Sequence, residues 1–132
     1  MTGPACNDIV SAGNVTIAPL TASTTFCIGS GSCTLSISDA DLGEITVGSG
    51  KTLTIGGTST GAMTIDSAYA FARPVVFLTQ SGSDITVGGR ISSSASGNAV
   101  TLASGRNFIN GYGAGVFNLT GGGRWLVYST KP

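Results

Sequence analysis

The sequence contains no histidine and very little charge. Among its 132 residues, 6 are Lys or Arg and 6 are Asp or Glu. Histidine is the usual general base and metal ligand near neutral pH, so its absence removes the common means of activating a serine or cysteine nucleophile. The sequence also has no Gly-x-Ser-x-Gly elbow and no phosphate-binding loop. We therefore predict a non-catalytic protein with no cofactor and no metal site.

Long apolar runs and basic clusters are missing as well. No apolar run exceeds five residues, whereas a transmembrane helix needs about 20, so we expect no membrane insertion. The arginines are scattered singly between residues 73 and 124. Binding along nucleic-acid phosphates needs clustered Lys and Arg. We therefore expect no nucleic-acid partner.

The sequence does contain a repeat of short, mostly apolar–polar–apolar triplets, separated by Gly, Ser and Asn. One series comprises Val15–Ile17, Leu35–Ile37, Leu53–Ile55, Val75–Phe77, Val100–Leu102 and Asn118–Thr120. A second, interleaved series comprises Phe26–Ile28, Ile45–Val47, Met63–Ile65, Ile85–Val87, Phe108–Ile109 and Leu126–Tyr128. In the second series the step is about 18 to 22 residues. Such a period favours a β-solenoid over a β-sandwich, whose strands are usually longer than three residues.

The sequence thus predicts an all-β protein that forms a parallel β-helix. We expect about six coils of roughly 20 residues over residues 15–132, after an irregular lead-in or cap at residues 1–14. Segment 38–44 is expected to be a corner or a single helical turn. Because side chains alternate along a strand, the flanking residues of each triplet should face inward. The expected core column is Ile37, Val47, Ile55, Ile65, Val87 and Phe108.

Threonines occupy the central, outward position of many triplets. They are Thr16, Thr46, Thr54, Thr64, Thr86 and Thr101. Rows of outward threonine on a flat solenoid face can bind ice or carbohydrate, which is an alternative function for this chain. The rows are divided between the two series, and threonine is also simply a favourable exposed strand residue.

Carboxylates give a second, weaker alternative, a β-helix enzyme that degrades polysaccharides. Glycoside hydrolysis needs two carboxylates about 5–9.5 Å apart. The candidates are Asp39, Asp41 and Glu44, with Asp66 or Asp84 from neighbouring coils. We favour the other interpretation, in which these are corner residues whose carboxylates accept hydrogen bonds from backbone N–H groups.

The three cysteines leave the disulfide pairing open. Cys27 and Cys33 flank a short Gly-Ser segment and lie close enough in sequence to form a bridge across a corner. Cys6 could instead pair with either of them and fix the lead-in segment. All three could also remain thiols, with Cys27 buried as a small apolar residue.

Three segments resemble filamentous-haemagglutinin-like exoproteins, which Gram-negative bacteria export by two-partner secretion. The most specific is Gly123-Arg124-Trp125-Leu126-Val127-Tyr128-Ser129-Thr130, preceded by a similar stretch at residues 97–110. Residues 37–46 are similar to a recurring phrase of the family. The resemblance covers about residues 35–130. Lys131 departs from it, because the family pattern has an acidic residue there. Residues 1–7 also lack the signal peptide of the family.

This resemblance implies a right-handed β-helix shaft within a large secreted adhesin or haemagglutinin. The expected location is extracellular or at the bacterial cell surface, and the chain is expected to be a segment of a longer shaft. The implied partners are an outer-membrane transporter for the parent protein and a host-surface or glycan receptor. The family motif is structural and brings no catalytic residue.

Charge and apolar residues are distributed unevenly along the chain. Residues 1–66 carry five acidic residues and one lysine, a net charge of −4, whereas residues 67–132 carry five basic residues and one acid, a net charge of +4. Trp125, Val127 and Tyr128 lie in the last expected coil. Because a solenoid exposes strand edges and its core at an uncapped end, we expect end-to-end self-association through these residues.

Overall fold

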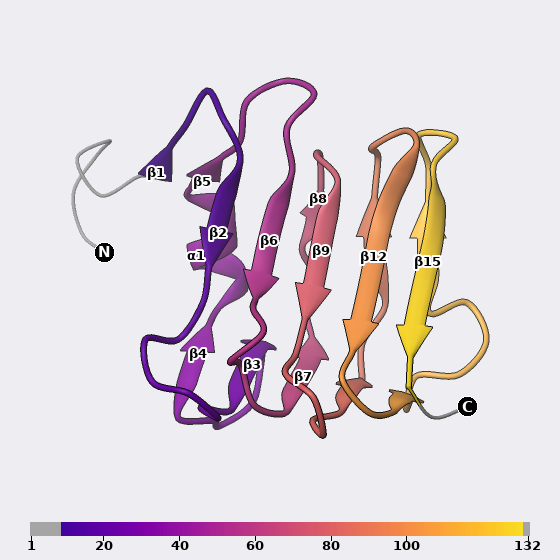
Figure 1. Cartoon of the computed structure of the whole chain (residues 1–132). Coiled ribbons are helices and arrows are strands. Elements are labelled where there is room, and N and C mark those ends of the chain that lie inside the picture. Colours follow the sequence, from indigo (N-terminus) through magenta and orange to yellow (C-terminus); the bar gives the residue numbers. More distant parts are fainter. Residues whose placement is uncertain (1–8, 131–132) are drawn as a thin grey trace.

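The computed structural model describes residues 9–130, which form fifteen short strands and a single helical turn (Figure 1). Every strand pair in this part of the chain is parallel. The prediction of an all-β protein built from parallel strands is therefore confirmed, and the arrangement is compatible with a β-solenoid.

The strands form four sheets. The long sheet contains, in spatial order, β2 (Val15–Ile17), β6 (Leu53–Gly56), β9 (Val75–Leu78), β12 (Asn98–Ser104) and β15 (Arg124–Ser129). The second sheet contains β4 (Leu35–Ile37), β3 (Phe26–Gly29), β7 (Met63–Asp66), β10 (Ile85–Val87) and β13 (Phe108–Asn110). The third contains β8 (Ala70–Phe71), β11 (Ile91–Ser93) and β14 (Phe117–Leu119), and β1 (Ile9–Val10) pairs with β5 (Ile45–Thr46).

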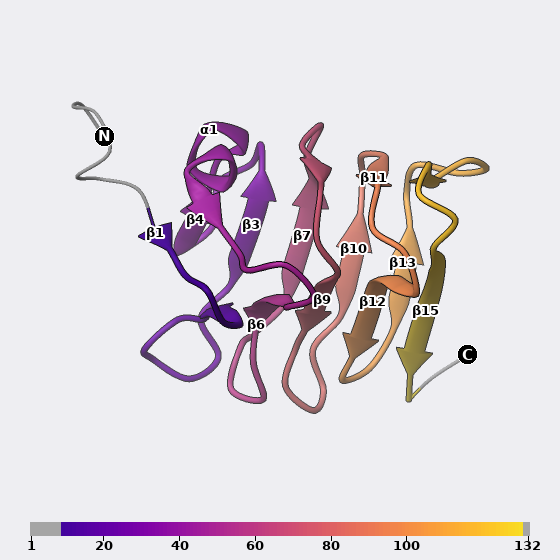
Figure 2. The same cartoon turned by 90° about the horizontal axis from the view of Figure 1, so that it is seen from above.

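From β6 onward the chain visits the three larger sheets in turn. The segments β6–β7–β8, β9–β10–β11 and β12–β13–β14 each contribute one strand to the long, second and third sheets, and β15 then returns to the long sheet. Figure 2 shows the second sheet extending from β4 to β13 in the same direction as the long sheet. Apolar side chains from all of these sheets form one continuous core.

The register corrects the grouping of triplets that the sequence suggested. Along the long sheet Leu53 pairs with Val75, Val75 with Val100, and Val100 with Trp125, which are steps of 22, 25 and 25 residues. Segment 126–128 therefore lies beside β12 and not in line with Phe108. Segment 35–37 belongs to the second sheet and segment 118–119 to the third. The two-series interpretation missed the third sheet because its strands, such as Ile91-Ser92-Ser93, alternate weakly.

The N-terminal part is less regular than the rest. Val15 pairs with Leu53, a step of 38 residues. The step is long because additional elements lie between β3 and β6. This additional segment comprises β4, α1 (Asp39–Gly43) and β5. A capping box holds α1, in which the Ser38 hydroxyl accepts from the Asp41 N–H and the Asp41 carboxylate accepts from the Ser38 N–H. Part of the expected irregular lead-in is a strand, because Ile9–Val10 pairs with β5.

The residues of the predicted core column are buried, apart from the last, but they do not form one column. Ile55 belongs to the long sheet, whereas Ile65 and Val87 pair in the second sheet. Ile55, Ile65 and Val87 are fully enclosed, and Val47 and Ile37 are 7% and 9% exposed. Phe108 only packs partly against the core. It pairs with Ile85 and belongs to β13, the last strand of the second sheet among the described residues.

Candidate functional site

The structure divides the six outward threonines between three sheets. On the long sheet the central column is Thr16, Thr54, Val76, Thr101 and Leu126, in spatial order. On the second sheet it is Ser36, Cys27, Thr64, Thr86 and Ile109. Thr46 lies apart from both, in β5. No more than two threonines are neighbours in either column, so the described strands form no continuous threonine surface.

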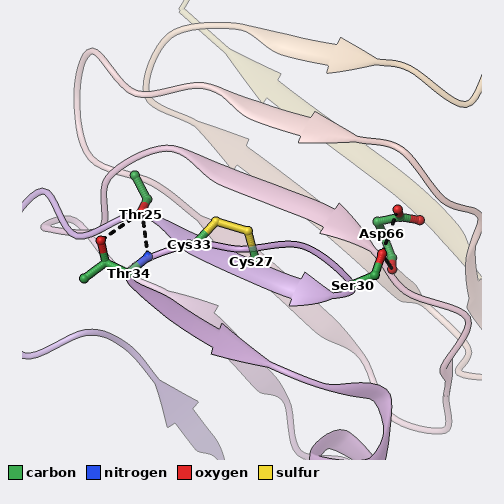
Figure 3. The surroundings of a disulfide bond; sticks show 6 residues. All are labelled: Thr25, Cys27, Ser30, Cys33, Thr34 and Asp66. Atoms are coloured by element: carbon green, nitrogen blue, oxygen red, sulfur yellow. Dashed lines mark hydrogen bonds between the residues drawn. A yellow bond between two sulfur atoms is a disulfide. The ribbon is translucent and has the colours of Figure 1, made fainter.

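A disulfide joins Cys27 of β3 to Cys33 in the loop that leads into β4 (Figure 3). The loop of residues 30–34 must return along β3, because β4 pairs with β3 in parallel. The disulfide fixes this return, and Cys27 becomes 4% exposed although its column faces outward. Two hydrogen bonds anchor the loop at its ends: Thr34 N–H donates to the Thr25 hydroxyl, and the Ser30 hydroxyl donates to Asp66. Cys6 lies outside the described residues.

Removing this disulfide should destabilise the N-terminal part of the fold. The closed loop is short, with a sequence separation of 6, for which the chain-entropy model gives about 2 kcal/mol. We expect the Cys27→Ala/Cys33→Ala variant to lose this amount in urea denaturation. Adding reductant to the parent chain should cause a similar loss, and reductant should leave the variant unchanged. A variant as stable as the oxidised parent would show that the bridge does not constrain the loop.

Two of the candidate carboxylates lie in one polar groove. Asp39 and Asp66 line a depression of about 490 Å³ together with Ser30 and Arg90. Both carboxylates already accept structural hydrogen bonds. Asp39 accepts from the Ser67 hydroxyl at 2.5 Å and from the Ala68 N–H at 3.1 Å. Asp66 accepts from the Ser30 hydroxyl at 2.8 Å. These contacts tie the disulfide loop to the end of β7, and α1 to the turn that follows it.

The other carboxylates are not brought into that groove. The hydrogen bonds from the Ser38 N–H and hydroxyl hold the pKa of Asp41 below its usual range. Glu44 follows α1 and lies at an apolar hollow described below. Asp84 forms a bidentate ion pair with Arg106, with distances of 2.8 Å from Nε to Oδ1 and 2.6 Å from Nη2 to Oδ2. Asp84 also accepts from the Asn107 N–H, so the pair connects the turns that precede β10 and β13.

The Asp84–Arg106 pair should make the stability of the fold depend on pH in the acidic range. The guanidinium of Arg106 lowers the pKa of Asp84 from 3.8 to about 2. Because the folded-state pKa is the lower one, this contribution is fully present above about pH 4 and is lost as the pH falls towards 2. We expect the urea midpoint to fall less between pH 5 and pH 2 in Asp84→Asn and in Arg106→Gln than in the parent chain. Equal losses in all three proteins would contradict the assignment.

The C-terminal end of the structure carries a stack of three aromatic rings, one from each larger sheet. Phe108 stacks on Phe117 with ring centroids 6.5 Å apart, and Phe117 stacks on Trp125 at 4.8 Å. The interplanar angles are 17° and 16°. We call these three residues the aromatic lid. The lid lines a hollow of about 470 Å³ together with Val116 and Val127. The sequence predicts an end contact through Trp125, Val127 and Tyr128. Tyr128 does not line this hollow, because it follows Val127 in β15 and lies on the opposite face of the strand. Phe117 was missed because its strand belongs to the unrecognised third sheet.

The N-terminal end carries an apolar hollow of about 260 Å³. We call it the N-terminal hollow, and its lining includes Ile9, Ile17, Leu35, Ile37 and Ile45. Asp41 and Glu44 also line it, so acidic groups lie beside an apolar surface. Both ends of the described solenoid thus present apolar side chains from its inward-facing columns.

Comparison of the chain with family models, with curated proteins and with solved structures found no match in any of the three. The resemblance to filamentous-haemagglutinin-like exoproteins therefore rests on the sequence motifs alone. Within residues 9–130 no group of three or more Cys, Asp or Glu side chains could hold a metal ion. In the same range the structure contains no helix of the length and apolarity needed to cross a membrane.

Proposed function

We propose that this chain is a structural shaft segment of a secreted, filamentous cell-surface adhesin and performs no catalysis. The observation that carries the proposal is the unbroken parallel pairing from β2 to β15, which gives a stack of strands whose length is set by the number of strands in the long sheet. Such a body spaces other domains without needing a reactive site of its own.

The finer architecture belongs to the same proposal. We infer right-handed winding, because crossover connections between parallel strands are right-handed in about 98% of cases. The long sheet has five strands, so we propose about five coils for the described residues, fewer than the six that the sequence suggested. At about 4.8 Å per strand, the four steps between them correspond to a shaft of roughly 19 Å.

The carboxylates support a structural role over an enzymatic one. Asp39, Asp41 and Asp84 each accept a hydrogen bond from a backbone N–H, which is the role of corner residues. The interrupted threonine columns likewise give less support to an ice-binding face. For the parent protein we propose an extracellular location, export through an outer-membrane transporter, and a host-surface or glycan receptor. The groove formed by Asp39, Asp66 and Arg90 offers polar groups that suit a weak contact with glycan hydroxyls.

A polysaccharide-degradation assay tests the non-catalytic assignment. We expect the chain to release no oligosaccharides from pectin, alginate or hyaluronan, as measured by the appearance of new reducing ends. Small-angle X-ray scattering on the same sample, at a dilution that keeps it monomeric, should show a folded particle whose dimensions match those of the stacked strands. Depolymerisation that is lost in Asp39→Asn or Asp66→Asn, but retained in Asp84→Asn, would identify the groove as an active site and overturn the proposal.

A further inference from the structure

We propose that the aromatic lid and the N-terminal hollow are complementary docking faces, through which one copy of this chain binds a second copy head to tail. The inference rests on the proposed shaft function and deepens it, because it names the partner of the shaft's two ends. Four observations support it: the exposure of the lid, the apolar lining of the hollow, the register of the strands and the charge of the two ends.

The lid contains inward-facing residues that nothing covers in the described structure. Trp125 pairs with Val100 and continues the inward column formed by Val15, Leu53, Val75 and Val100. Those four residues are at most 9% exposed, whereas Trp125 is 51% exposed. A tryptophan in a core column gains its full burial energy only when another layer covers it. The lid is therefore an interior layer that faces solvent.

The N-terminal hollow has the apolar lining that such a layer requires. Its apolar lining includes Ile17 of β2 and Leu35 of β4, the terminal strands of the long and second sheets. β-Branched and leucine side chains pack well against flat aromatic rings. Both strands also leave one edge without a partner strand among the described residues. Such an edge can accept a further parallel strand.

The strand register allows the two ends to continue one another. In the central column of the long sheet, Leu126 at the C-terminal end and Thr16 at the N-terminal end occupy equivalent positions. If β15 of one copy pairs with β2 of the next, Trp125 lies over Val15 and Val127 lies over Ile17. On the second sheet β13 then meets β4, which places Phe108 over Leu35.

Charge favours this head-to-tail orientation over the two symmetric ones. Asp41 and Glu44 border the N-terminal hollow, whereas Arg124 is exposed at the start of β15 beside Trp125. Two lids brought together would oppose like charges, and so would two hollows. A head-to-tail contact is heterologous, so it repeats without closing and builds open chains of increasing length. Because apolar burial and strand pairing supply most of the attraction, raising NaCl from about 50 to 500 mM should weaken it less than about tenfold.

Sedimentation velocity of the 132-residue chain over a concentration series tests the proposal, with one variant for each face. Trp125→Asp places an acid on the lid, and Leu35→Lys places a base in the hollow. Each variant alone should raise the dissociation constant at least tenfold. A mixture of the two retains one intact lid and one intact hollow, so it should form a 1:1 dimer with nearly the parent affinity and grow no further. Thr101→Asp, on the outward face of β12, is the matched control and should associate like the parent.

Each contrary outcome overturns the docking model in a distinguishable way. Association of Leu35→Lys alone would indicate a lid-to-lid dimer, and association of Trp125→Asp alone would indicate a hollow-to-hollow dimer. Equal association of the control and both variants would indicate a lateral contact. A parent chain that stays monomeric at hundreds of micromolar would exclude the docking but not the shaft function, which the degradation and scattering experiments test separately. Circular dichroism melts identify a variant that does not fold, and failure of the mixture to associate when both variants fold also overturns the model.

Discussion

Replacing Ile65 by Asp should lower the free energy of unfolding by about 3–5 kcal/mol, the cost of an uncompensated buried charge. Ile65 is fully buried in β7, and its neighbours in the inward column are Ile28 and Val87, both also fully buried. Neither of these two neighbours has a side-chain atom that could donate a hydrogen bond to a carboxylate. The aspartate would therefore remain protonated inside or force the coil open.

Thr86→Asp is the matched control for this experiment. Thr86 lies in β10 of the same sheet, in the outward column beside Thr64, and its side chain is only partly covered. The same substitution there should cost less than about 1 kcal/mol, as is usual for surface changes. Urea denaturation followed by far-ultraviolet circular dichroism measures both variants. Similar losses at the two positions would show that Ile65 does not face the core.

The second large effect is expected at Gly56, which ends β6. Its φ is +94°, a conformation that residues with a Cβ rarely adopt. A Cβ at this position would overlap the carbonyl oxygen of Leu78 in the next strand and lie 2.7 Å from Cε of Met63. We expect Gly56→Ala to cost about 3–4 kcal/mol, the sum of left-handed strain and overpacking.

Gly50→Ala separates these two causes. Gly50 also has a positive φ, +73°, but a Cβ there would meet nothing within 4 Å. In this variant the free energy of unfolding should fall only by the cost of left-handed backbone strain, about 1–2 kcal/mol. The difference between the two alanine variants then measures how closely β9 passes over the end of β6. Equal losses would mean that the backbone of β9 moves aside at little cost.

The parts of the fold that the sequence predicts are those marked by local alternation. Met63-Thr64-Ile65 and Ile85-Thr86-Val87 carry the same pattern and do lie side by side, because equal triplets bury equal faces. Leu35-Ser36-Ile37 carries that pattern too, yet it follows β3 within the same sheet after a five-residue loop. Alternation shows which residues face inward, but it does not show which strand becomes the neighbour.

The candidate surfaces also differ in whether the sequence alone could predict them. The exposed end at Trp125 could be predicted, because a tryptophan next to Leu126 and Val127 marks an apolar strand. The ring stack with Phe117 could not, because it depends on three sheets meeting at one end. The groove at Asp39 depends on the additional segment β4–α1–β5, which brings residue 39 to Ser67 and Ala68. Contacts over nearly thirty residues of separation leave no mark in a local pattern.

The position of Trp125 also gives the molecule a built-in optical reporter. It is the single tryptophan of the chain, and it lies at one extremity of a body in which each coil contacts only its neighbours. Its fluorescence therefore senses fraying of that extremity, whereas circular dichroism averages over all strands. The two spectroscopic denaturation curves should not superimpose, and the emission maximum should shift to shorter wavelength whenever another surface covers the indole.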